Sequence, residues 1–140
     1  MTTSGLSSAS ARVRSAVSRS IVALAVLTAA LLLAPDDSAD DWPNERWQSL
    51  PERIRERLPQ LRCEVIPPQA ALPRRAAAVA CADVVLSSCA TTQLLTAYCG
   101  VPLVAMGSAT DALPERDVIR VLAGERQALS TEEVMKALGF

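Results

Sequence analysis

Small hydroxyl-bearing residues cluster where an apolar segment gives way to a predicted helix. The stretch from Ala82 to Leu95 reads Ala-Asp-Val-Val-Leu-Ser-Ser-Cys-Ala-Thr-Thr-Gln-Leu-Leu. The first amides of a helix lack acceptors within it, and with nearby hydroxyl groups they suit an anion such as a diphosphate. The natural donors are the four hydroxyl residues Ser87, Ser88, Thr91 and Thr92. The alternative is that they only cap the helix, as Ser and Thr often do.

The composition excludes several other kinds of chemistry. The 140 residues are 50% hydrophobic and 21% charged, with a formal net charge of −1, which suits one compact domain. There is no histidine, so Ser-His-Asp catalysis, Cys-His catalysis and a His-ligated metal are excluded within this chain. The near-neutral balance argues against nucleic-acid binding. We therefore assign no catalytic residue, no metal ion and no nucleic-acid partner.

Short apolar segments alternate with helical patterns from Leu31 onward. The predicted strands cover residues 31–33, 61–66, 84–86 and 103–106. The predicted helices are one opened by Asp41 and reaching Leu58, and three over 72–81, 92–99 and 131–138. This alternation predicts an α/β fold, a Rossmann-like parallel sheet with helices on both faces. Ligands of such sheets bind beyond the carboxyl ends of the strands.

Three details of the predicted helices can be checked against a structure. Pro51 is expected to divide the first helix into two pieces. Trp42 and Trp47 are expected to pack that helix on the sheet rather than to stack on a sugar. Arg74 and Arg75 are expected to be exposed on the alanine-rich second helix.

The front of the chain differs from the body. Residues 1–35 carry three arginines and no acid, and residues 21–34 are apolar apart from one threonine. We interpret residues 1–30 as a helical or disordered leader and residues 31–140 as the domain, with a buried helix over residues 11–29 favoured over a secretory signal. The apolar run is too short to span a membrane, which predicts a cytoplasmic protein, peripheral to the inner membrane at most. Export through residues 1–34 is the alternative.

Two further groups of residues have a purely structural interpretation and a second, alternative one. The cysteines Cys63, Cys81, Cys89 and Cys99 show no C-x-x-C spacing, so we predict reduced core cysteines, with two disulfides as the alternative. The acids Asp36, Asp37, Asp40 and Asp41 predict a solvated loop, with a cation site as the alternative.

The stretch 82–88, the helix after it and Gly100-Val101-Pro102-Leu103-Val104-Ala105 resemble the donor-side domain of GT-B glycosyltransferases. The Trp-Pro-Asn-Glu-Arg-Trp segment at 42–47 looks like the family 9, or heptosyltransferase, version. Residues 82–102 also match that family without a gap, and the same stretch is similar to lipid-A-disaccharide synthase. The resemblance covers residues 31–107.

The resemblance implies one half of a GT-B enzyme that moves a heptose-type sugar onto lipopolysaccharide or a similar glycan. It implies a nucleotide-diphosphate sugar as substrate, metal-independent displacement and no cofactor. Its implied donor-binding residues are Ser87, Ser88, Cys89, Ala90, Thr91, Thr92, Glu115 and Arg116. Glu115 and Arg116 would approach the base or ribose, and a surface ion pair is their bland alternative.

The chain departs from the family at the residues that matter most. Family 9 enzymes place Asp-Thr-Gly-Pro-x-His where this chain has Cys89-Ala90-Thr91-Thr92-Gln93-Leu94. Asp41 stands where a basic residue is expected. In the family the acceptor site and the base belong to the N-terminal half, so transfer is expected to need such a domain or a separate chain. The alternatives are a degenerate, non-catalytic interaction domain and a small exported or membrane-tethered domain.

Overall fold

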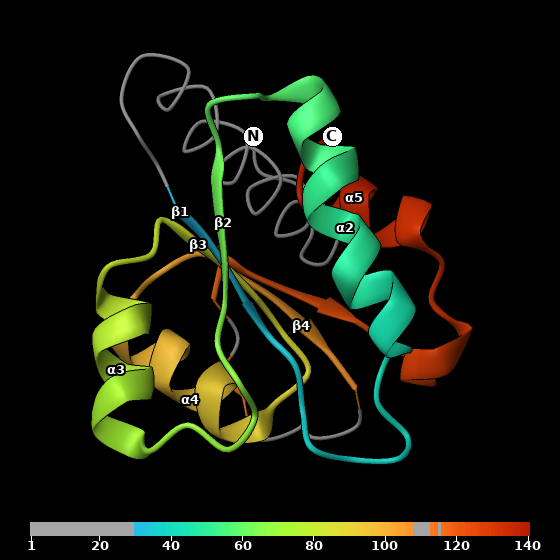
Figure 1. Cartoon of the computed structure of the whole chain (residues 1–140). Helices are drawn as coiled ribbons and strands as arrows, with labels where there is room; N and C mark the ends of the chain where they lie inside the picture. Colours follow the sequence, from blue (N-terminus) through green and yellow to red (C-terminus); the bar gives the residue numbers. More distant parts are fainter. Residues whose placement is uncertain (1–29, 108–112, 115) are drawn as a thin grey trace, which may run out of the picture.

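Five parallel strands form one sheet in the order β2-β1-β3-β4-β5 (Figure 1). The computed structural model describes residues 30–107, 113–114 and 116–140. The strands are β1 (Ala30–Ala34), β2 (Arg62–Val65), β3 (Val84–Ser87), β4 (Leu103–Met106) and β5 (Ile119–Leu122). The helices are α2 (Asn44–Arg57), α3 (Leu72–Ala80), α4 (Ala90–Cys99), the short 3₁₀ helix η2 (Arg126–Ala128) and α5 (Thr131–Ala137). The leader and the helix expected over 11–29 lie outside the described residues.

The helices cover both faces of the sheet, which confirms the predicted Rossmann-like α/β class. Helices α2 and α5 pack on one face, and α3 and α4 pack on the other (Figure 1). A right-handed crossover places its helix on opposite faces when the sheet grows in opposite directions. The chain moves from β1 outward to β2 and then back past β1 to β3, so α2 and α3 must lie on different faces.

The central strands β1, β3 and β4 are apolar apart from Ser87, because both of their faces are covered. All five residues of β1 are buried. Its odd-numbered residues Leu31 and Leu33 join the core under α2 and α5, and Leu32 and Ala34 join the core under α3 and α4. The edge strand β2 lacks this cover on its outer side, and three of its four residues are exposed.

Helix α2 differs from the prediction in two ways. It runs without a break through Pro51, because the buried residues Trp47, Leu50 and Ile54 hold its inner face on both sides of the proline. Asp41 does not cap it: the helix begins after Pro43 with no side-chain cap. The two tryptophans are buried edge to face, 5.1 Å between ring centroids, which confirms their packing role.

The other helices begin and end close to their predicted positions. Gly100 ends α4 with a φ of 71°, in the left-handed region that suits glycine. Ser130 and Glu133 form the predicted capping box of α5. Strand β5 was not predicted; of its residues Ile-Arg-Val-Leu, Ile119 and Leu122 are buried and Val121 is exposed. No described helix is long and apolar enough to cross a membrane.

All four cysteines are free, but only one lies in the core. Cys89 is buried and Cys63 is half-buried, and burial raises the pKa of the Cys63 thiol despite the opposing effect of Arg55. Cys81 and Cys99 are exposed, so the prediction of core cysteines is wrong for these two. Both stand at the end of a helix, where the chain turns at the surface.

Candidate functional site

The carboxyl ends of β1 and β3 lie side by side where the strand order reverses. Ala34 is level with Ser87 in the register of these two strands. The connection after β1 leads to α2 on one face, and the connection after β3 leads to α4 on the other. The loops therefore diverge at this point, which in doubly wound sheets is where ligands bind.

The two serine hydroxyls at this edge face into the protein. Ser87 Oγ donates to the carbonyl of Ala34 at 2.9 Å and accepts from the amide of Cys89 at 3.0 Å. Ser88 Oγ accepts from the amide of Asp36 at 3.1 Å. Both serines are buried. They fix the loop between β3 and α4 against the end of β1, instead of pointing outward as donors.

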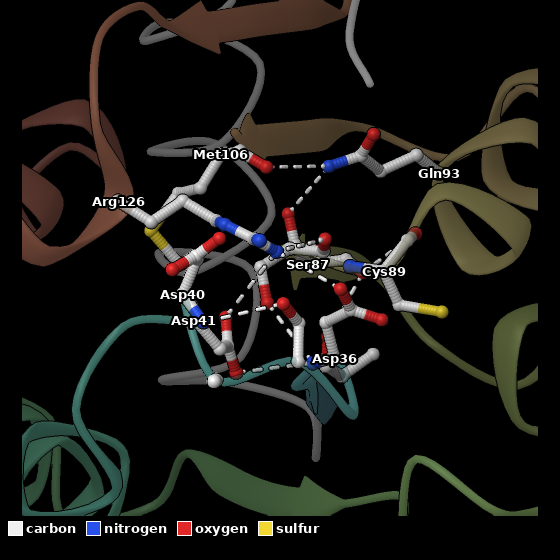
Figure 2. Close-up of polar contacts among 12 residues, drawn as sticks. Asp36, Asp40, Asp41, Ser87, Cys89, Gln93, Met106 and Arg126 are labelled. Atoms are coloured by element: carbon white, nitrogen blue, oxygen red, sulfur yellow. Dashed lines mark hydrogen bonds and ion pairs between the residues drawn. The ribbon is translucent and has the colours of Figure 1, made fainter. Parts of the chain in front are cut away.

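Gln93 fixes the same loop from within α4. Its Nε2 donates to the carbonyls of Ser87 and Met106, each at 2.9 Å, and so joins the carboxyl ends of β3 and β4 (Figure 2). The side chain is fully buried. Its Oε1 has no hydrogen-bond partner in the described part of the chain. Sequence analysis gave Gln93 no role of its own.

Arg75 lies beneath the first turn of α4, where it is only 3% exposed. One nitrogen, Nη1, donates to Thr92 Oγ1 at 2.7 Å and lies 3.9 Å from Cys89 Sγ. The other, Nη2, donates to the carbonyls of Pro68 at 2.9 Å and Ala70 at 3.1 Å. The prediction that Arg75 is exposed is wrong, because these acceptors sit where the chain turns from β2 into α3.

In the described part of the chain, the charge of Arg75 is stabilised by the dipoles of hydroxyl and carbonyl groups and not by an acid. Among the described residues, the ion pairs within 4.0 Å involve other arginines. Carbonyl and hydroxyl oxygens satisfy its donors but leave a full positive charge in the interior. That charge lies next to the amino end of α4, where the helix dipole is also positive. The two effects add, and both favour an anion at this position.

A second arginine reaches the carboxyl ends of β1 and β3 from the segment after β5. Arg126 Nη1 contacts Asp36 Oδ2 at 3.0 Å, the carbonyl of Ser88 at 3.2 Å and Asp41 Oδ1 at 3.7 Å (Figure 2). Its side chain is 13% exposed. It lies against Gly107, where an added Cβ would come within 2.8 Å of Arg126 Cδ. Sequence analysis gave Arg126 no role, because nothing local to it indicates these partners.

The acidic loop after β1 is only partly solvated. Asp37 and Asp40 are exposed as expected. The prediction is wrong for Asp41, which is nine-tenths buried and accepts from the amide of Asp36 and from Trp47 Nε1, both at 3.1 Å. In residues 30–107, 113–114 and 116–140 no group of His, Cys, Asp or Glu side chains could hold a metal ion.

The amino end of α4 is the part of the predicted site that faces outward. Ala90 and Thr91 are exposed, while Cys89 and Thr92 are buried. The helix begins at Ala90 after Cys89, two residues earlier than predicted, and no side chain caps it. The first three amides, those of Ala90, Thr91 and Thr92, therefore have no side-chain acceptor at the N-cap.

Arg116 lies far from these residues. It precedes β5 and donates to the carbonyl of Ala97 at 2.6 Å, in the last turn of α4. That turn is at the amino edge of the sheet, opposite the edge where Ser87 and Ser88 lie. The structure thus separates Arg116 from the other predicted donor-binding residues. Glu115 lies outside the described residues.

The chain was compared with known protein families, curated proteins and solved structures. No protein family, no curated protein and no solved structure matches this chain.

Proposed function

We propose that this chain is a glycosyltransferase-like domain that binds the diphosphate of a nucleotide sugar at the amino end of α4. The observation that carries the proposal is the uncapped first turn of α4, which opens at the point where the strand order reverses. Three amides there lack a side-chain acceptor; two of them belong to the exposed residues Ala90 and Thr91, where a diphosphate oxygen would supply an acceptor. The resemblance of residues 31–107 to the family 9 donor domain supports the same ligand class.

The electrostatics of this region support an anionic ligand. Arg75 places a buried positive charge beneath the first turn, through its contacts with Thr92 and Cys89. Arg126 places a second guanidinium next to Ser88, in the loop that leads into α4. An anion held between them would be partly shielded from water, where electrostatic attraction is stronger than at an open surface.

The contribution of this chain to a transfer reaction would be to the leaving group. When the sugar leaves, negative charge develops on the departing diphosphate, and preorganised amides stabilise such charge. The exposed Thr91 would add a hydroxyl donor at the same place. The acceptor and the base would come from an N-terminal GT-B domain or a separate chain, so we expect binding without turnover from this chain.

The test is a titration of the full chain with ADP-, GDP- and UDP-sugars and with inorganic pyrophosphate, followed by thermal unfolding and amide NMR. A ligand at 100 times its dissociation constant stabilises the native state by about 2.7 kcal/mol. We expect one nucleotide class to raise the melting temperature and to shift the amides of residues 88–92. Thr91→Pro, which removes one of the three amides, should weaken this binding, and Thr91→Ala is the matched control for the lost hydroxyl.

A second candidate function is a non-catalytic interaction domain. The observation that favours it is the internal use of the predicted donors, since the hydroxyls of Ser87, Ser88 and Thr92 all bond within the protein. Arg126 is likewise already paired with Asp36. If the chain is folded and no probe changes its melting temperature or its amide signals, that result would support this candidate and rule out donor binding.

A further inference from the structure

The contact between Arg126 and the acids after β1 is poorly made for a permanent ion pair. Asp41 Oδ1 is buried and has no hydrogen-bond partner in the described chain, although it lies 3.7 Å from Arg126 Nη1. A buried carboxylate oxygen without a donor destabilises the state that contains it. The other oxygen, Oδ2, already accepts from Asp36 and Trp47. The pairing therefore leaves one acid only half satisfied.

The guanidinium is also only partly used. Its contacts with Asp36, Ser88 and Asp41 all run through Nη1, which leaves Nη2 and Nε outside them. A guanidinium that binds a carboxylate or phosphate at full strength does so through two parallel N–H groups. Arg126 makes no such two-point contact with either acid. In residues 30–107, 113–114 and 116–140, Nη2 and Nε have no acceptor among these contacts, so they suit another planar or multivalent acceptor.

Arg126 already lies beside the amino end of α4. It donates to the carbonyl of Ser88, which directly precedes the N-cap residue Cys89. Ala90 and Thr91, whose amides would hold a phosphate, follow Cys89 directly in the chain. In Figure 2 dashed lines join the Arg126 side chain to the acids.

We propose that Arg126 is a phosphate-binding residue that is paired with Asp36 and Asp41 in the unbound protein. A diphosphate displaces these acids by forming a two-point contact with the guanidinium. This inference rests on the proposed function and names the group that selects its ligand. The acids repel any anion that enters, so a weakly bound monophosphate fails to displace them. A diphosphate can bind the α4 amides and both guanidinium nitrogens together, and so it succeeds.

The test compares Asp36→Asn, Arg126→Gln and Arg126→Lys in the full chain, with Arg53→Gln as the matched control. Arg53 also pairs with an acid, Glu132 at 2.8 Å, but on the exposed surface of α2. The probes are inorganic pyrophosphate, inorganic phosphate and the nucleotide sugars, with dissociation constants measured by calorimetry. Circular dichroism checks that each variant is folded.

We expect opposite effects from the two partners of the ion pair. Arg126→Gln should weaken pyrophosphate binding at least about tenfold, the scale of one lost charge-assisted hydrogen bond. Asp36→Asn should strengthen it about threefold or more, because it releases the arginine and removes a like charge. Arg126→Lys keeps the charge but not the fork, so it should reduce the preference for pyrophosphate over phosphate. Arg53→Gln should change nothing.

Other outcomes overturn the inference in distinct ways. If Arg126→Gln and Arg126→Lys bind pyrophosphate as the unmodified chain does, Arg126 is structural while diphosphate binding stands. If Asp36→Asn weakens binding, the acid positions the arginine rather than withholding it. If neither the unmodified chain nor Asp36→Asn binds any probe, diphosphate binding fails and the inference fails with it. If Arg126→Gln does not fold, Arg126→Lys and Asp36→Asn still decide the question.

Discussion

Two arginines approach the amino end of α4 from different sides, and their partners are of opposite kinds. Arg75 is almost fully buried, and its partners among the described residues are neutral, chiefly the oxygens of Thr92, Pro68 and Ala70. Arg126 is more exposed and bonds mainly to acids. Neutral partners leave a charge in place, whereas acidic partners cancel it. The comparison separates a fixed positive charge in the interior from a charge that a ligand can release.

Removal of Arg75 is expected to have the largest effect on stability. Arg75→Met leaves the carbonyls of Pro68 and Ala70 and the hydroxyl of Thr92 without their donor, which should destabilise the fold by about 3 kcal/mol. Urea unfolding of the full chain measures this. The matched control is Arg74→Met on the exposed side of the same helix, expected to change stability by less than about 0.5 kcal/mol. Equal effects at the two positions would remove the distinction.

A smaller effect should follow from moving Arg126 without removing it. Gly107→Ala strains a backbone with φ of 105° and places a Cβ 2.8 Å from Arg126 Cδ. Gly124→Ala is the control, because its φ of 96° is similar and nothing lies within 4 Å of the added Cβ. Each strained backbone costs about 1 kcal/mol or more, and the clash should add about 1 kcal/mol at Gly107 alone. Identical losses in thermal unfolding would mean that Arg126 moves aside freely.

The smallest expected effect on stability is that of removing Arg126, and it should depend on the salt concentration. Arg126→Gln should destabilise the chain by at most about 1 kcal/mol at low ionic strength, since the ion pair with Asp36 is partly exposed. The loss should shrink in 1 M NaCl, where the Debye length falls to about 3 Å. The loss from Arg75→Met should not change with salt, because its partners are neutral. A salt-dependent effect at Arg75 would indicate an acidic partner and would contradict the comparison.

The sequence predicted the elements better than the partners of their side chains. Apolar runs such as 103–106 and the capping box at Ser130 are local signals, and they matched the structure. The exposed Arg75 was a reasonable expectation for an alanine-rich helix, and it was wrong. Its acceptors come from the turn before α3 and from α4, and only the packed fold brings these together.

The same limit applies to the candidate site. The sequence identified the loop between β3 and α4, because a strand followed by small hydroxyl residues is a local pattern. It also named the serine hydroxyls as donors to an anion, with capping as the alternative, whereas they bond to the carbonyl of Ala34 and the amide of Asp36. Arg126 meets Asp36 across 90 positions of the chain. Contacts of this separation leave no trace in spacing or periodicity.

The position of β1 in the sheet has a consequence for how the chain is made. Its amino end is tied to Asp83, and its carboxyl end to Ser87, each 53 positions further along. At a synthesis rate of about 5–20 residues per second, β1 precedes β3 by about 3–10 s, and of its two neighbours only the edge strand β2 emerges in between. During that interval the five buried residues of β1 have at most one strand to pair with. Apolar residues that are exposed in this way are prone to aggregate, so shielding of residues 30–34 until β3 has emerged should raise the yield of folded protein.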